Sequence, residues 1–225
     1  MSVILFDIDG TLLSSGGAGR LAMQNALAEE FQRSEEIPPG MMAGRTDRGI
    51  IQMLFELHGL EESEENIAWF VLRYLSLLTQ AMHLRAGGIL PGVEELLAAL
   101  QETGSHIGLL TGNMARGAQI KLDHHGLAEH FPFGAFGDAR LTRDELAQDA
   151  FDTVREHIGA EIQAEEIWII GDTPRDISCA RAIGARVLAV ATGVNDLDDL
   201  SEHGPDLLLD DLSDTAAVRS KLGVS

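Results

Sequence analysis

The chain has 225 residues, of which 45% are hydrophobic, so it can bury one complete α/β core and has length left for a smaller second unit. Its 36 acidic and 16 basic residues give a net charge of -20, which argues against binding to a nucleic-acid backbone or to an anionic membrane surface. An anionic substrate would have to be attracted locally, by a metal ion and a few arginines.

The single cysteine, Cys179, cannot form an internal disulfide, which fits a reducing compartment. No basic region precedes the short apolar run near the N-terminus, and apolar stretches elsewhere are interrupted by charges before they reach the length of a membrane span. We therefore expect a soluble, cytoplasmic protein. Independently of these observations, we expect a monomer or weak dimer.

The first predicted element is a buried strand over Val3–Phe6, an apolar run that stops at Asp7 and Asp9. Residues two positions apart on a strand project to the same side. Both carboxylates should therefore point into the crevice at the carboxyl end of a parallel sheet, where α/β proteins bind ligands. Gly10 allows a sharp turn after them. Two acids this close predict a metal ion or an acid/base pair, although Asp-Gly is also common in plain turns.

Residues 14–85 carry helical rather than strand patterns. The segment SSGGAG at 14–19 is a flexible connection, and apolar residues at three- and four-residue spacing follow it. The helices are expected over 21–31, 47–58 and 63–84. The next strand begins only at His106, and roughly seventy residues are far more than a crossover between parallel strands needs. We therefore predict an all-helical unit at 14–85 that covers the site as a lid, inserted into an α/β core formed by 1–13 and 86–225.

A second polar group follows the strand predicted at 106–110, which ends in Thr111, Gly112 and Asn113. A hydroxyl, a backbone amide that a ligand can approach closely and a side-chain amide suit the oxygens of a phosphate. The same residues can instead cap the helix that follows, and the pattern alone leaves both interpretations open.

Two further polar groups lie in the C-terminal half. Arg143 falls in the first turn of a helix predicted over 142–158, where the helix dipole disfavours a cation, which suggests a functional reason for its position. The alternative is a solvated surface arginine. The strand predicted at 167–170 ends in GDTPRD, in which Asp172 and Asp176 flank a tight turn, again at the carboxyl end of a strand.

Together these motifs resemble those of the haloacid dehalogenase superfamily. DIDGTLL is similar to its first motif, LLTGN to the second, a basic residue at a helix start to the third, and GDTPRD to the last, in this order along essentially the whole chain. With a helical insertion after the first motif, the phrase GDTPRDISCARAIGARVLAVATG is most similar to the phosphoglycolate phosphatase branch. The resemblance implies a Rossmann-like, doubly wound parallel sheet with an inserted helical cap, and magnesium-dependent hydrolysis of small phosphate monoesters.

The resemblance also implies roles for single residues. Asp7 is the expected nucleophile, which forms an aspartyl phosphate, and Asp9 is the expected general acid and base. Mg2+ is expected to bind Asp7, the backbone carbonyl of Asp9, and Asp172. Thr11 and Asp176 are expected to support these ligands. Charge on the phosphate oxygens is expected to be stabilised by Thr111, Gly112, Asn113 and Arg143.

The motifs leave the roles of three other arginines open. Most members of the superfamily carry lysine where Arg143 stands, and Arg140 is the rival for that position. Arg45, in the AGRTD segment of the lid, matches the specificity loop of the family and could meet a second anionic group of the substrate; an exposed loop residue is an equal alternative. Arg175 has no role that the motifs assign.

The motifs are compatible with several functions. Phosphosugar mutases share all four motifs, so only the product distinguishes them from phosphatases. Dehalogenase chemistry is less favoured, because those relatives lack the acid that corresponds to Asp9. A catalytically idle module that binds phosphate or a partner is the alternative from a different class. The expected partner is a small phosphorylated metabolite, with no nucleic acid and no membrane.

Overall fold

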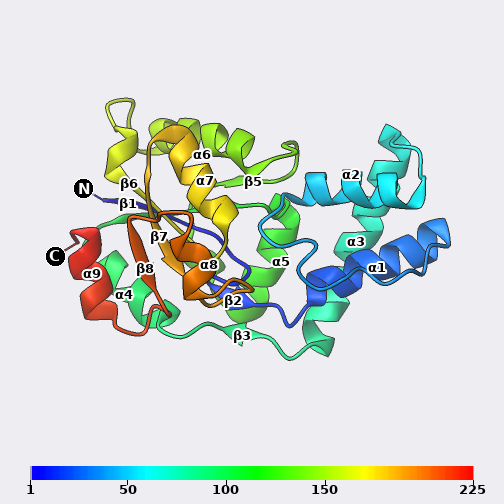
Figure 1. Ribbon diagram of the computed structural model, residues 1–225, viewed down its shortest axis with the longest axis horizontal. Helices are drawn as coiled ribbons and strands as arrows, with labels where there is room; N and C mark the ends of the chain where they lie inside the picture. Colours follow the sequence, from blue (N-terminus) through cyan, green and yellow to red (C-terminus); the bar gives the residue numbers. More distant parts are fainter. Residues whose placement is uncertain (1, 225) are drawn as a thin grey trace.

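The computed structural model describes residues 2–224, and in this range six parallel strands form one sheet at the centre of the fold (Figure 1). The strand order is β5-β4-β1-β6-β7-β8. The strands are β1 (Val3–Phe6), β4 (His106–Thr111), β5 (Gly134–Phe136), β6 (Ile167–Gly171), β7 (Arg186–Val190) and β8 (Leu207–Leu209). The chain thus winds outward from β1 in both directions, and the predicted α/β class with a doubly wound parallel sheet is confirmed.

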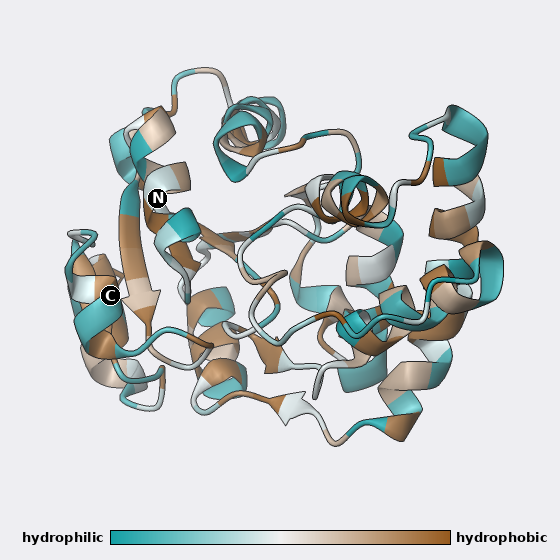
Figure 2. Ribbon diagram, turned by 45° about the vertical axis from the view of Figure 1, so that its right-hand side comes forward, coloured by the Kyte–Doolittle hydropathy of each residue, from teal (hydrophilic) through white to brown (hydrophobic). Residues whose placement is uncertain are grey.

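Helices cover both faces of this sheet. In β1, Ile4 and Phe6 belong to the apolar cluster of one face, whereas Val3 and Leu5 belong to that of the other, because successive side chains of a strand alternate. The first face is covered by α4 (Val93–Glu102), α5 (Ala115–His125) and α9 (Thr215–Leu222). The second is covered by α6 (Arg143–Ile158), α7 (Pro174–Ile183) and α8 (Leu197–Ser201). Short 3-10 helices occupy Ala128–His130 and Ala164–Glu166. Burial from both sides explains the uninterrupted apolar sequence of β1, and Figure 2 shows that the covering helices combine hydrophobic and hydrophilic residues.

The segment between β1 and α4 forms helices that lie beside the sheet, at the right in Figure 1. These are α1 (Ala18–Phe31), α2 (Asp47–His58) and α3 (Glu64–Leu84). They share an apolar cluster of their own, in which Phe55, Phe70 and Tyr74 are buried. Where the chain leaves and rejoins the core, β2 (Leu13–Ser14) pairs antiparallel with β3 (Gly88–Ile89). Although α3 has 21 residues, no helix among residues 2–224 is both long and apolar enough to cross a bilayer.

Candidate active site

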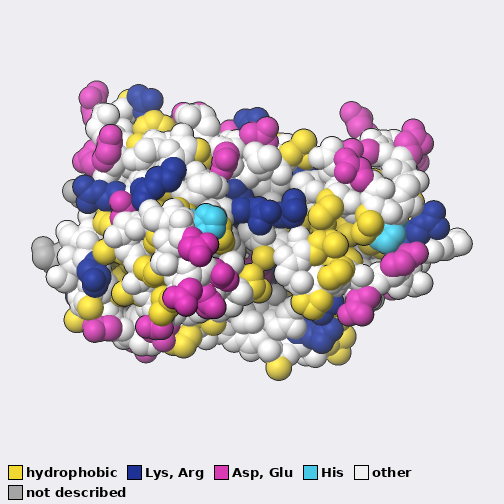
Figure 3. All heavy atoms as spheres, in the orientation of Figure 1, with side chains coloured by type: hydrophobic (Ala, Val, Ile, Leu, Met, Phe, Trp, Pro, Cys, Tyr) yellow, Lys and Arg dark blue, Asp and Glu magenta, His cyan; other side chains and the backbone are white. Residues whose placement is uncertain are grey.

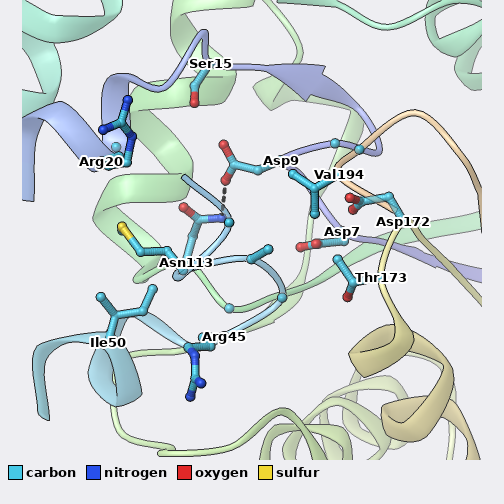
Figure 4. A pocket seen from close by; sticks show the side chains of 18 of the residues that line it. Asp7, Asp9, Ser15, Arg20, Arg45, Ile50, Asn113, Asp172, Thr173 and Val194 are labelled. Carbon is cyan, nitrogen blue, oxygen red and sulfur yellow. Dashed lines mark hydrogen bonds between the residues drawn. The ribbon is translucent and has the colours of Figure 1, made fainter. Parts of the chain in front are cut away.

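The order of the strands brings the sequence motifs to one place. Because β1 lies between β4 and β6, the carboxyl ends of these three strands open into the same crevice, the usual ligand position in such sheets. A pocket of about 470 Å³ lies there, between the sheet and the helical segment. From the core it is lined by Asp7, Asp9, Asn113, Arg143 and Asp172. Figure 4 shows four of these side chains, Asp7, Asp9, Asn113 and Asp172, around the pocket.

Three buried carboxylates lie together at the ends of β1 and β6. Oxygen atoms of Asp7, Asp172 and Asp176 lie within 4.8 Å of one another. Burial raises the pKa of Asp7 to about 6; Arg143 acts against this rise, and Asp176 adds to it. Burial and the negative charges of Asp176 and Asp7 also raise the pKa of Asp172. The Oδ1 atom of Asp172 accepts a hydrogen bond of 3.2 Å from the Thr11 hydroxyl. Such a concentration of buried negative charge fits a divalent cation, because carboxylate oxygens are its preferred ligands.

Arg143 supplies the positive charge that faces this cluster. Its side chain is buried at the start of α6, where a guanidinium nitrogen lies 3.2 Å from Asp7 and another contacts Asp176. Attraction to these two carboxylates outweighs the unfavourable helix dipole. Arg140, the rival residue, instead pairs with Asp149 at the protein surface. Of the two arginines, the structure brings Arg143 to the acid cluster.

The start of α7 holds Asp176 in place. The backbone N–H and the hydroxyl of Thr173 donate hydrogen bonds of 3.0 and 2.7 Å to Asp176 Oδ2, which caps the helix. Asp176 Oδ1 contacts Arg143. Both oxygens of Asp176 are therefore engaged by the protein, whereas Asp7 and Asp172 line the pocket.

The Asp9 carboxylate points away from this cluster (Figure 4). Its Oδ2 accepts hydrogen bonds from the Asn113 amide at 2.9 Å and from the Lys121 ammonium at 2.5 Å. Burial acts to raise the pKa of Asp9, but the charge and hydrogen bond of Lys121, with that of Asn113, outweigh it, so the pKa lies below its ordinary value. The Lys121 ammonium thus compensates the negative charge of this carboxylate.

Lys121 is a residue that the sequence analysis missed. It is only 4% exposed and lies on the inner side of α5, together with buried Ala118 and Leu122. Its position on the helix could have indicated that Lys121 is buried and paired. A lysine among the inward-facing residues of an amphipathic helix is rarely buried without a partner.

The loop after β4 is held against the start of α2. The Thr111 hydroxyl accepts hydrogen bonds from the backbone N–H and the side-chain amide of Asn113, at 3.3 and 2.9 Å. The Asp47 N–H donates to the Gly112 carbonyl at 2.7 Å, and the Asp47 carboxylate accepts from the Met114 N–H at 2.8 Å. A Cβ at Gly112 would overlap with the backbone just before α2, so this close approach requires glycine. Asp47 is a second residue that the sequence analysis missed.

Arg45 lines the pocket, but its guanidinium points away from the acidic residues in Figure 4. Its Nε donates a hydrogen bond of 3.1 Å to the Met41 carbonyl. Arg175 donates to the Ala43 carbonyl at 3.0 Å, and burial together with the nearby charge of Arg45 lowers its pKa. Figure 3 shows basic side chains gathered near the middle of this face, between α7 and α2. Positive charge therefore collects near the pocket in a chain whose net charge is -20, which favours the approach of an anion.

The chain is similar in sequence to known proteins. A family profile described as haloacid dehalogenase-like hydrolase matches residues 4–190. A phosphoglycolate phosphatase of Synechococcus elongatus is 28% identical over 224 residues, which cover 95% of each chain. A phosphoglycolate phosphatase of Photobacterium profundum is 29% identical over 220 residues, which cover 93% of this chain and 92% of the relative.

Solved structures share the fold. A hydrolase from Pseudomonas syringae superposes with a TM-score of 0.77 at 22% identity, and the match covers 99% of both chains. CbbY from Rhodobacter sphaeroides, solved in complex with phosphate, gives a TM-score of 0.77 at 18% identity over 95% of this chain and 96% of that one.

Proposed function

The chain belongs to the haloacid dehalogenase-like hydrolases, and we propose that it is a magnesium-dependent phosphatase that hydrolyses a small phosphate monoester such as phosphoglycolate. The observation that carries this proposal is the placement of Asp7. It lies at the end of β1, in the pocket wall, beside Asp172 and paired with Arg143. The relatives named phosphoglycolate phosphatase support the choice of substrate class.

In this proposal Asp7 is the nucleophile. A carboxylate oxygen of Asp7 attacks phosphorus, the bond from phosphorus to the alcohol oxygen breaks, and an aspartyl phosphate forms. Water then attacks the phosphoryl group, which releases inorganic phosphate and restores the carboxylate. One difficult displacement is thereby divided into two easier ones.

Asp9 is the proposed acid and base for these two steps. Its carboxylate lines the pocket and faces Ser15 on the side of the helical segment (Figure 4). From there it would donate a proton to the oxygen of the leaving alcohol, and would then accept one from the attacking water. The negative charge of a bound phosphate would favour the protonated form that the first step requires.

A magnesium ion fits the carboxylates at this site. Asp7 and Asp172 present oxygens to the pocket, and the backbone carbonyl of Asp9 would be the third protein ligand, while Thr11 orients Asp172. When bound, Mg2+ would offset the repulsion between the Asp7 carboxylate and the phosphate. Asp176 supports the site through its contact with Arg143.

The remaining groups would bind the phosphate oxygens and enclose the substrate. The hydroxyl of Thr111, the amide of Asn113 and the guanidinium of Arg143 would stabilise the charge that develops on those oxygens, with Gly112 allowing close approach. In this proposal residues 14–85 form the cap over a core made by 1–13 and 86–225. The cap residues in the pocket wall would exclude bulk water during the reaction.

Released phosphate, measured over a panel of phosphorylated metabolites that includes phosphoglycolate, tests this function. We expect release with MgCl2 and none with EDTA. Asp7→Asn should abolish release, because an amide is not a nucleophile of comparable strength, whereas Asp152→Asn, at an exposed position on α6, should leave it unchanged. Wild-type turnover in Asp7→Asn would refute the proposal. Isomerised sugar phosphate in place of free phosphate would identify a mutase instead.

A further inference from the structure

Lys121 is buried in the wall of the pocket, yet none of the steps above uses it. Its ammonium lies 2.5 Å from Asp9 Oδ2 and 2.5 Å from Asn113 Oδ1. The Asn113 amide nitrogen also donates to Asp9 Oδ2, at 2.9 Å. The three side chains therefore form a closed ring of hydrogen bonds, in which each contacts the other two.

This ring gives the Asp9 carboxylate one orientation. Both hydrogen bonds end on Oδ2, so neither Lys121 nor Asn113 engages Oδ1. The carboxylate faces Ser15, another residue of the pocket wall (Figure 4). The Asp9 side chain is 38% exposed, whereas that of Lys121 is 5% exposed, so the lysine contacts the acid from the protein interior. The same contacts keep Asp9 apart from the cluster formed by Asp7, Asp172 and Asp176.

A second carboxylate, from the helical segment, lies near Lys121. The positive charge of Lys121 acts on Asp47, which is anchored to the Met114 N–H at 2.8 Å. Lys121 thus stands between one acid of the core and one at the start of α2. An ammonium that is hydrogen-bonded to Asp9 and Asn113 and attracted by buried Asp47 has little freedom to move, so its position is defined by the fold.

From this geometry we propose that Lys121 is the positioning residue for Asp9, which it aims at the oxygen of the leaving alcohol. The inference rests on the proposed phosphatase function. It predicts that loss of Lys121 harms the transfer of a proton to the leaving group more than it harms the binding of phosphate or the attack by Asp7. A purely structural lysine would affect all of these together.

The test compares two leaving groups in one protein preparation. An alkyl phosphate, phosphoglycolate, releases a basic alkoxide that needs a proton, whereas p-nitrophenyl phosphate releases a weakly basic phenolate that does not. The parameter is kcat/KM, which covers the steps up to phosphoryl transfer to Asp7 and leaves out the later attack by water. The ratio of the two kcat/KM values is independent of the fraction of folded enzyme.

In Lys121→Met we expect kcat/KM for phosphoglycolate to fall about 100-fold, the lower range for general acid catalysis, and that for p-nitrophenyl phosphate to fall less than about tenfold. Asp9→Asn should show the same pattern. Arg116→Met, at an exposed position on α5, should leave the ratio at the wild-type value. If Lys121→Met does not fold, Lys121→Gln serves instead, because its amide can still donate to Asp9 but carries no charge; its ratio should lie between those of the wild type and Asp9→Asn.

An equal loss on both substrates, or no loss on either, would overturn the role of Lys121. Failure of the proposed function itself would look different, since the wild-type protein would then release no phosphate from either substrate.

Discussion

Removal of Arg143 tests whether a single guanidinium compensates the buried acids. Arg143 is 3% exposed and contacts two carboxylates, Asp7 at 3.2 Å and Asp176. Arg143→Met keeps much of the side-chain volume but leaves both carboxylates without their cation. Breaking a buried ion pair in this way typically costs about 3–5 kcal/mol, a large share of the total stability of about 5–15 kcal/mol of a typical domain.

Urea unfolding at pH 8 in EDTA measures this loss, because Asp7, whose pKa is about 6, is then ionised and no divalent cation can replace the arginine. Added MgCl2 should restore part of the stability, since the ion would bind the same acids in the folded state. Arg140→Met is the matched control: its ion pair with Asp149 is at the surface, so it should hardly shift the unfolding midpoint. Equal stability of Arg143→Met and Arg140→Met in EDTA would show that Arg143 does not compensate the two buried acids.

Two further predictions concern pH and close packing. Burial raises the pKa of Asp47 from 3.8 to about 6, so the folded state binds the proton more tightly than the unfolded state, and the stability that this provides is lost as the pH rises from about 4 to about 6. The loss amounts to about 3 kcal/mol of unfolding free energy. Asp47→Asn should not show this loss. If the unfolding free energies of the wild type and Asp47→Asn changed in parallel with pH, the raised pKa would not belong to Asp47. A Cβ at Gly193 would overlap with the carboxylate of Asp172, so Gly193→Ala should displace this acid and lower phosphatase kcat/KM about 100-fold. Gly88→Ala, where an added Cβ meets nothing within 4 Å, should be active, and equal activity of the two alanine variants would show that the position of Asp172 is not critical.

Local patterns in the sequence predicted the architecture of the core. The apolar run of β1 and the acids that follow it predicted a buried parallel strand with a polar end, and the structure places Asp7 beside Asp172 at the ends of β1 and β6. The prediction is correct because parallel strands are buried on both faces and therefore have a continuous apolar sequence. In addition, the carboxyl ends of parallel strands lie at one edge of the sheet, so the polar residues that follow them meet there.

The sequence by itself therefore determined the strands β1, β4 and β6, the helical segment between β1 and β4, and the polar residues at the strand ends, since each depends on neighbouring residues. Tertiary structure alone placed Arg143 at the acid cluster and Arg140 at the surface, and it alone brought Lys121 to Asp9 across 112 positions of sequence. The physical reason is that a buried charge is stabilised by whichever opposite charge the packing of distant elements places beside it. Helical periodicity marks Lys121 as inward-facing but carries no information about the acid that it meets.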